Sequence, residues 1–208
     1  MDLALLERWL TGWSLGRGLP LPTRRGDGLY VEVGQPKQLR RYVFVDAGAG
    51  LQHCAEQVSE ACVFVKAAVT SEILRAALPA RWQIEPLQYV MVGPQPMPRP
   101  VQLPTGYRNT VGVENAGHVV RVENARGELA AIGRVALHQG CAVFDRIETS
   151  ESHRRKGLGT VVMYALDALA QQAGTTERLL VASDAGRALY ETFGWRVVAP
   201  LATAVLAA

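Results

Sequence analysis

The segment 153–160, His-Arg-Arg-Lys-Gly-Leu-Gly-Thr, constrains the fold of this chain more than any other segment. A run typical of a strand precedes it (142–147), and a run typical of a helix follows it (161–172). Two glycines one residue apart allow a tight turn that exposes backbone amides. The first N–H groups of the next helix lack intrahelical partners and lie at the positive end of its dipole. With three cations at 154–156, the sequence predicts a site for phosphate or pyrophosphate.

The glycine spacing excludes two common phosphate loops. A Walker loop requires Gly-x-x-x-x-Gly-Lys-Ser/Thr, and no such string follows the strand. A dinucleotide fingerprint requires Gly-x-Gly-x-x-Gly, but the position three residues after Gly159 is Val162. The loop therefore belongs to another class of anion site.

A second pattern lies downstream of this loop. A short apolar run at 178–182 is typical of a strand, and Ser183 follows it as a plausible helix N-cap. The segment 185–193 is helical in pattern, and Gly194 stands where helices commonly end. The chain then resumes as a strand at 195–198.

Both patterns resemble motifs of the GNAT N-acetyltransferase superfamily. Arg-x-x-Gly-x-Gly, formed by Arg154, Gly157 and Gly159, resembles the loop that binds the pyrophosphate of acetyl-CoA in that family. The string Ala188-Leu189-Tyr190-x-x-x-Gly194-Trp195 resembles its final helix, with a shift of one position in the small residues. The motifs occur in the family's order and at about its separation, and the resemblance covers residues 112–200.

The resemblance implies an α/β (α+β) fold of the GNAT type, with a mixed central sheet flanked by helices. Four prolines between residues 93 and 100 exclude a helix or a central strand there. We therefore expect a divergent N-terminal α/β lobe at 1–96 and the acetyl-CoA-binding acetyltransferase domain at 97–208. The family fold normally begins with a strand and two helices, and 101–117 is too short for them. Either the N-terminal lobe supplies these elements or they are reduced.

Hydrophobic periodicity and turn residues predict the remaining elements. Helices are expected at 2–13, 51–60 and 71–78. Strands are expected at 29–33, 41–45, 61–68, 87–92, 118–123, 129–138, 141–149 and 202–206.

The family's cofactor contacts can be carried onto matching positions. The resemblance implies that acetyl-CoA is bound by Ile147, Thr149, Arg154, Arg155, Lys156, Gly157, Leu158, Gly159, Thr160 and Ser183. Backbone amides of 155–160 would hold the pyrophosphate, and the strand at 146–150 would pair with the pantetheine arm. Ser183 stands where the family often has an asparagine, which weakens the contact expected there.

Two residues are candidates for catalysis. Tyr190 matches the tyrosine that protonates the leaving thiolate in many members, and the alternative is a core tyrosine. Glu148 is a candidate base or substrate anchor, because an amine must lose a proton before it attacks. Its alternative is a solvated carboxylate at a strand edge. Asp145, three residues earlier, is expected on the opposite face of the strand, in a structural or surface pair with the following Arg146.

Composition narrows the partners. The chain has 208 residues, of which 49% are hydrophobic, and a formal charge of +3, too mild to indicate nucleic acid. Three widely spaced cysteines suggest no disulfide framework, and four histidines show no metal-ligand spacing. The sequence shows neither a signal peptide nor a membrane helix. We therefore expect a cytoplasmic protein with no metal and no membrane partner.

The expected activity is transfer of an acetyl group from acetyl-CoA to a primary amine of a small molecule, with Tyr190 as general acid. One alternative is a non-catalytic module that binds or senses CoA. Another is acetylation of a peptide or protein amine. A homodimer is compatible with the family, and the sequence leaves the acceptor unidentified.

Overall fold

One long sheet runs through the whole molecule. The structure is a computed structural model that describes residues 1–97 and 102–207, and its path of strands is β1-β2-β3-β4-β12-β6-β11-β10-β9-β8-β7, with β5 paired to β12. The strands are β1 (Thr23–Arg25), β2 (Gly28–Gln35), β3 (Gln38–Phe44), β4 (Val63–Ala67), β5 (Trp82–Ile84), β6 (Gln88–Val92), β7 (Tyr107–Glu114), β8 (Gly117–Asn124), β9 (Leu129–His138), β10 (Cys141–Thr149), β11 (Glu177–Ala182) and β12 (Arg196–Leu206).

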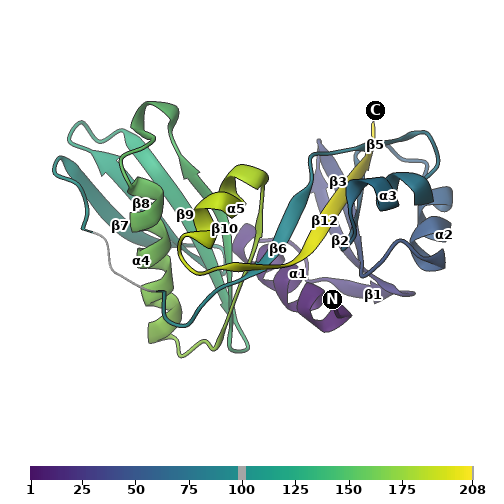
Figure 1. The fold of residues 1–208 in the computed structure, drawn as a ribbon, viewed down its shortest axis with the longest axis horizontal. Helices are drawn as coiled ribbons and strands as arrows, with labels where there is room; N and C mark the ends of the chain where they lie inside the picture. The colour runs from purple at the N-terminus through teal and green to yellow at the C-terminus, as the bar shows by residue number, and fades with distance from the viewer. Residues whose placement is uncertain (98–101, 208) are drawn as a thin grey trace.

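The helices cover the sheet on both faces, as the resemblance implies. They are α1 (Leu3–Arg17), α2 (Ala49–Gln57), α3 (Ser71–Ala77), α4 (Leu158–Gln172) and α5 (Asp184–Glu191), with a 3-10 turn η1 (Glu151–His153). Two lobes face each other across a gap, with β12 and β6 joining them (Figure 1). The expected mixed sheet flanked by helices is therefore confirmed.

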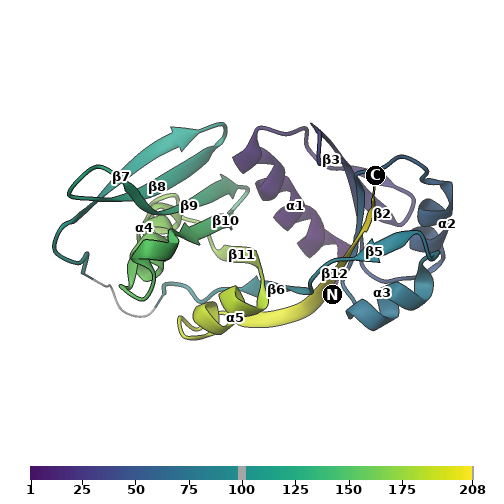
Figure 2. The same cartoon turned by 90° about the horizontal axis from the view of Figure 1, so that it is seen from above.

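Helix α1 lies between the lobes and packs on both. The side chain of Asp2 caps its first turn by accepting a hydrogen bond from the Leu5 amide at 2.7 Å, and Gly18 ends it in the left-handed conformation. Its buried face, which includes Trp9 and Trp13, packs with Val143 of β10 and with the inner face of β2 and β3. Figure 2 shows α1 and α4 on opposite sides of strands β8–β10. The N-terminal helix thus covers one face of the C-terminal part of the sheet.

Strand β12 connects the two halves of the sheet. Residues 196–201 pair with β6, and residues 202–206 pair with β4. The sequence predicts two separate strands here, but the structure has one continuous strand, with a register shift between Val197 and Ala199. Pro200 lies in the part of β12 that has β6 as its one described sheet partner, and proline is tolerated on a strand that is open on one side.

The described residues of the proline-rich segment, 93–97, form neither helix nor strand. Pro98 and Pro100 lie outside the described residues. Strands from before and after this segment alternate in the sheet, since β6 lies between β12 and β11. The division at residues 96 and 97 remains a proposal about the organisation of the chain. Three strands, β1, β5 and β7, are absent from the sequence prediction.

Candidate active site

A β-bulge interrupts β10 where the site begins. The register against β9 shifts between Asp145 and Glu148, and Arg146 has a positive φ of 52°. Asp145 pairs with Arg134, whereas Glu148 pairs with Ile132, two residues away on β9. Residues two apart on a strand share a face, so the bulge brings Asp145 and Glu148 to the same face. The expectation of opposite faces is wrong, because the inserted residue changes the alternation.

Strands β10 and β11 separate beyond the bulge. They pair in parallel only over 141–144 and 177–180. The end of β11, Val181 and Ala182, pairs with β6 on its other side. Within the described residues, the backbone of β10 after Phe144 therefore has sheet partners on its β9 side alone. Such an edge offers unpaired N–H and C=O groups to an extended ligand.

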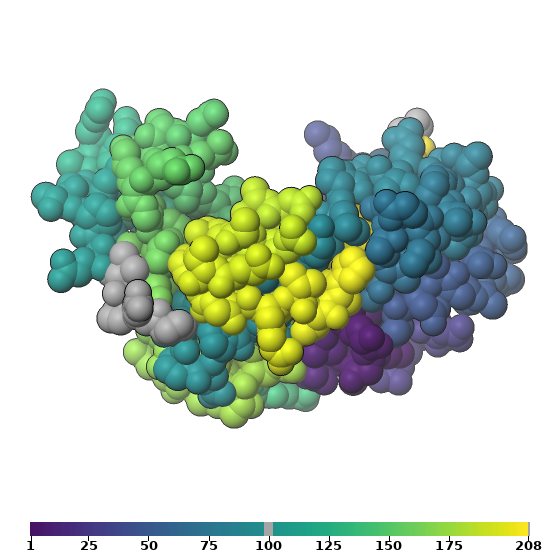
Figure 3. Space-filling model, viewed as in Figure 1, coloured from purple at the N-terminus to yellow at the C-terminus, as the bar shows by residue number. Residues whose placement is uncertain are grey.

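The separation of these strands opens a cavity of about 760 Å³. Of the residues expected from the sequence, six line it: Ile147, Glu148, Thr149, Arg154, Ser183 and Tyr190. Arg155, Lys156, Gly157, Leu158, Gly159 and Thr160 are not among the described lining residues. The space-filling view shows the surface hollowed between the lobes, above α5 (Figure 3). The cavity therefore opens into the gap between the lobes.

The loop that precedes α4 presents backbone amides. Gly157 is the N-cap, with φ 75° and ψ 5°, and no side chain caps this end of the helix. The first helical hydrogen bond into the loop runs from the Val161 amide to the Gly157 carbonyl, at 3.1 Å. Leu158 is buried in the core, so it can offer a ligand only its backbone. The amides before Val161 remain available to an anion, as at other helix N-termini.

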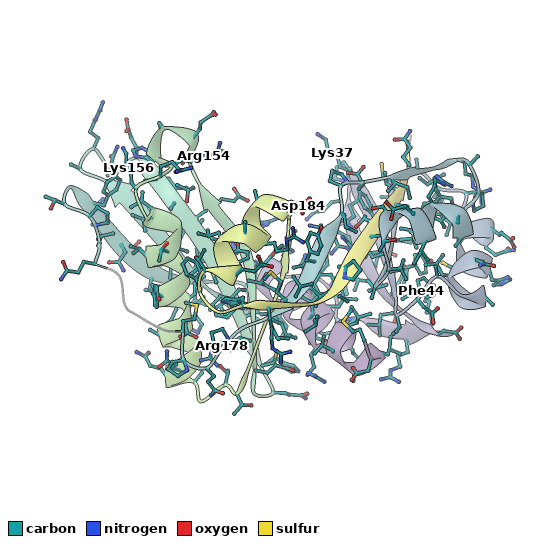
Figure 4. All side chains as sticks on the ribbon, viewed as in Figure 1. Lys37, Phe44, Arg154, Lys156, Arg178 and Asp184 are labelled. Carbon is teal, nitrogen blue, oxygen red and sulfur yellow. The ribbon has the colours of Figure 1, made fainter. Side chains whose placement is uncertain are left out.

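The three cations of the loop point in different directions. Arg154 lines the cavity and lies 3.7 Å from Glu151. The ammonium of Lys156 instead donates a hydrogen bond to the Tyr107 hydroxyl at 3.2 Å, and that hydroxyl lies 2.9 Å from Nδ1 of His153. Figure 4 labels Arg154 and Lys156 on this loop. Of the three side chains, Arg154 alone is a described lining residue, while Arg155 is exposed.

Tyr190 lies on α5, belongs to the hydrophobic core and also lines the cavity. It is 7% exposed and packs beside Trp195, with 6.2 Å between ring centroids. No described residue forms a hydrogen bond with its hydroxyl, which leaves that donor available to a ligand. Burial, assisted by the negative charge of Asp145, raises the pKa of Tyr190 to about 12. The phenol is therefore protonated throughout the physiological range.

The two carboxylates of β10 differ in their partners. Asp145 accepts two hydrogen bonds from the guanidinium of Arg17 on α1, at 2.8 and 3.0 Å. This bidentate pair occupies both carboxylate oxygens, so Asp145 has a structural role, but its partner is Arg17 and not the neighbouring Arg146 that the sequence suggests. Glu148 is exposed, lines the cavity and takes part in none of the ion pairs among the described residues.

Ser183 is the N-cap of α5, as predicted. Its Oγ accepts a hydrogen bond from the Gly186 amide at 3.3 Å. This bond uses the oxygen as acceptor and leaves the hydroxyl proton available to a ligand. Sequence reasoning missed Gln88, Gly186 and Leu189, which also line the cavity. Leu189 lies in the string that resembles the family's final helix but is not among the expected site residues. Gln88 belongs to no motif, and the pairing of β6 with β11 brings it to this place.

Within the parts of the chain that the structure describes, no helix is both long and apolar enough to cross a membrane. Over the same residues, no group of three histidine, cysteine or acidic side chains is arranged to hold a metal ion.

Comparison with solved structures shows the same fold. A GCN5-related N-acetyltransferase from Kribbella flavida aligns with a TM-score of 0.68 at 16% identity, over 98% of this chain and 95% of that one. A GCN5-related N-acetyltransferase-like protein from Streptococcus suis 89/1591 gives 0.62 at 12% identity, over 98% and 100%. An acetyltransferase of the GNAT family from Novosphingobium aromaticivorans gives 0.59 at 15% identity, over 96% and 97%.

None of the curated proteins matches this chain. The sequence model of the acetyltransferase (GNAT) family matches residues 72–195, a span from α3 to the residue before β12 that includes β10, the loop and α5. This span is more than half of the 208 residues. The chain therefore belongs to the acetyltransferase (GNAT) family.

Proposed function

We propose that this protein transfers an acetyl group from acetyl-CoA to the primary amine of a small molecule. One observation carries the proposal: the unpaired edge of β10, Arg154 of the loop that leads to the uncapped start of α4, and Tyr190 line one cavity. An extended thioester with a phosphate at one end needs these three features. Positioning two reactants side by side is itself a large part of catalysis.

The residues present fit acetyl-CoA as the cosubstrate. The edge of β10 at Ile147 and Thr149 would pair with the amides of the pantetheine arm, as an added strand does. The amides of 155–160 would bind the pyrophosphate, assisted by the Arg154 side chain. The helix dipole contributes about 0.3–2 kcal/mol to such a site, so several backbone hydrogen bonds together contribute more. Side chains of Arg155 and Lys156 would act through their charge.

Tyr190 would act on the leaving sulfur. A thiol has a pKa near 8.5, well below the value of about 12 for Tyr190. Complete proton transfer from this phenol to a thiolate is therefore unfavourable by about 3–4 pKa units unless the bound state lowers the difference. Its first contribution is a hydrogen bond to the charge that develops on sulfur, and proton donation follows from the same contact.

Glu148 would act on the amine. An alkylamine has a pKa near 10.4, so it must lose a proton to become a nucleophile. Glu148 lines the cavity without an ion-pair partner among the described residues, whereas Asp145 is held by Arg17. Glu148 can therefore accept that proton, directly or through water, or hold the ammonium group before it is lost.

The cellular location, the cofactors and the partners are also part of the proposal. We propose a cytoplasmic enzyme without a metal, a nucleic acid partner or a membrane partner, in which residues 97–208 carry the acetyl-CoA site. A homodimer is compatible with it. The acceptor is proposed to be a small molecule because the net charge of +3 is mild for a polyanionic or polycationic partner.

The decisive experiment measures thiol release from acetyl-CoA with a panel of primary amines. The proposal expects amine-dependent release, accompanied by the acetylated amine in mass spectrometry. A protein that binds CoA in calorimetry but transfers no acetyl group to any amine would be a CoA-binding module instead. Transfer to peptide amines alone would replace the small-molecule acceptor with a protein.

A further inference from the structure

Lys66 is a buried cation on the inner face of the N-terminal lobe. It lies in β4 between Val43 of β3 and Thr203 of β12 in the ladder, and it is 4% exposed. Its ammonium donates hydrogen bonds to Oε1 of Gln88 at 2.7 Å and to Oγ1 of Thr203 at 2.6 Å. No carboxylate of the described residues lies within 4 Å of it. An ammonium has three donors, so one remains for a ligand.

Arg41 is a second buried cation on the same face. Arg41 pairs with Phe64, and Val43 pairs with Lys66. Since Arg41 and Val43 are two residues apart on β3, Arg41 shares the face of Lys66. Its guanidinium stacks over the ring of Trp13 at 3.8 Å and donates to Gln38 at 3.3 Å. Arg41 is 8% exposed, and its Nε is buried with no hydrogen-bond partner. Buried donors are almost always satisfied, so this one indicates a missing acceptor.

Both cations line one small cavity of about 320 Å³. Gln88 and Ser183 line this cavity and also the large cavity between β10 and β11. The smaller cavity therefore adjoins the reaction cleft on the side of the N-terminal lobe. It lies beside Ser183, which immediately precedes the labelled Asp184 of α5 (Figure 4).

The electrostatics of this cavity favour an anion. Burial lowers the pKa of Lys66 well below its ordinary value and the pKa of Arg41 to about 9. The facing charges are Arg17, which is paired with Asp145, and Glu85, an exposed residue of the same cavity. Two buried basic side chains with no carboxylate within 4 Å are costly to bury in the charged form, and a bound anion would compensate this cost.

We propose that the acyl acceptor carries a carboxylate, and that Lys66 and Arg41 bind this carboxylate while the acceptor's amine lies in the reaction cleft. The substrate class is thus an amino acid or a similar small amino carboxylic acid. A guanidinium and an ammonium together match the two oxygens of a carboxylate. This inference rests on the proposed acetyl transfer, since it names the acceptor for the same site.

The binding test uses N-acetyl amino acids and the matching N-acetyl amino acid amides, titrated calorimetrically in the presence of CoA. These probes are product analogues, so their binding does not depend on turnover. Wild-type protein is expected to prefer the carboxylate over its amide by about 10- to 100-fold, the range of hydrogen bonds to charged groups. Equal affinity for both would overturn the inference.

Three variants and a control locate the effect. Lys66→Met and Arg41→Met are each expected to reduce the preference for the carboxylate by about tenfold or more. Glu85→Gln removes, from the exposed rim of the cavity, a negative charge that repels the ligand's carboxylate. It is expected to strengthen carboxylate binding by about 2- to 5-fold. It keeps the test decisive if the buried variants fold poorly. Lys37→Met, at an exposed turn of the same lobe, is the matched control and should change nothing.

The same variants separate this inference from the proposed function. Thiol release with amines, without a carboxylate preference, would retain acetyl transfer and overturn the inference. Carboxylate binding that Lys66→Met abolishes, without thiol release from any amine, would retain the anion site and overturn the transfer. In the turnover assay, Lys66→Met is expected to raise KM for amino acids while KM for acetyl-CoA stays unchanged. A loss confined to kcat would contradict a binding role.

Discussion

The molecule has two proposed anion sites of different construction. At the start of α4 the donors are backbone amides, and the neighbouring cations are exposed. In the N-terminal lobe the donors are two buried side chains, Lys66 and Arg41, which reach the ligand cavity from separate strands. The first region depends on a short contiguous segment, and the second depends on the pairing of β3, β4, β6 and β12. One fold thus combines a proposed site with backbone donors and a proposed site with side-chain donors.

This difference determines how each region responds to substitution. A backbone site keeps its donors when a nearby side chain is removed, but it fails when an added atom blocks the approach to the amides. A buried side-chain site loses its ligand when one cation is removed, and the folded protein gains stability, because burial of that charge was unfavourable. The predictions below test this contrast, together with the role of Tyr190, which lines the large cavity.

The largest effect is expected at Tyr190. Tyr190→Phe should lower kcat by about 10²- to 10⁴-fold, the range for loss of a positioned proton donor, and should leave the dissociation constant of CoA unchanged. Because the pKa of Tyr190 is about 12, the phenol should produce no alkaline loss of activity below about pH 11. Steady-state kinetics across pH measure both. Tyr42→Phe in β3 serves as the control, and full activity in Tyr190→Phe would remove the proposed role.

Next in size is the stability of Lys66→Met. Burial lowers the pKa of Lys66, so the unfolded chain binds this proton more tightly than the folded protein does. The free energy of unfolding of the wild-type protein should therefore rise as the pH increases toward 10.5, the ordinary pKa of lysine, and should level off above it. At pH 7 the variant should be more stable by about 1–4 kcal/mol.

Denaturant unfolding of both proteins at several pH values measures this difference. The difference in unfolding free energy between Lys66→Met and wild type should narrow as the pH approaches 10.5. Lys37→Met is the control. A variant less stable than wild type at pH 7 would show that the hydrogen bonds to Gln88 and Thr203 outweigh the burial of the charge.

A smaller effect is expected at Gly159. A Cβ there would lie 3.4 Å from Oγ1 of Thr149, an ordinary contact, so the fold itself accommodates alanine. Gly159→Ala should leave stability equal or raise it by about 0.4–1 kcal/mol. It should weaken CoA binding by about 10- to 100-fold, because the methyl group crowds the pyrophosphate. Calorimetry with CoA and thermal melts measure the two effects, with Gly112→Ala in β7 for comparison. Unchanged CoA affinity would place the phosphates elsewhere.

The smallest effect is expected at Arg154. Arg154→Gln should weaken CoA binding by only about 2- to 5-fold, because the side chain is largely exposed and its charge is screened by solvent. The loss should shrink further at high ionic strength. A titration of CoA at low and high salt measures it. A loss comparable to that of Gly159→Ala would make the loop a side-chain site and remove the contrast between the two regions.

Much of the C-terminal half could be predicted from the sequence, because its signals are local. The glycine spacing at 157–159 and the capping residue Ser183 each act within one turn of the chain, and the structure has helices at both places. The bulge at Arg146 could not be predicted. A positive φ at a non-glycine residue follows from the tertiary structure around it, and its effect was to reverse the expected face of Glu148.

For the N-terminal half, the sequence predicts the main helices and strands but not how they pack and pair with one another. Its main helices and strands follow from periodicity, yet nothing local indicates that α1 packs between the lobes or that β12 pairs with β4. The cavity at Lys66 depends on that pairing. A lysine in the apolar run Val63–Ala67 carries no functional signal until the neighbouring strands are known.

The most direct test of the central claim is a crystal structure of the protein with CoA. The account predicts the pyrophosphate against the amides of 155–160, the pantetheine arm along the edge of β10 beyond the bulge, and the sulfur within hydrogen-bonding distance of the Tyr190 phenol. Binding of CoA with the loop left empty, or with the sulfur on the far side of the sheet from Tyr190, would contradict it.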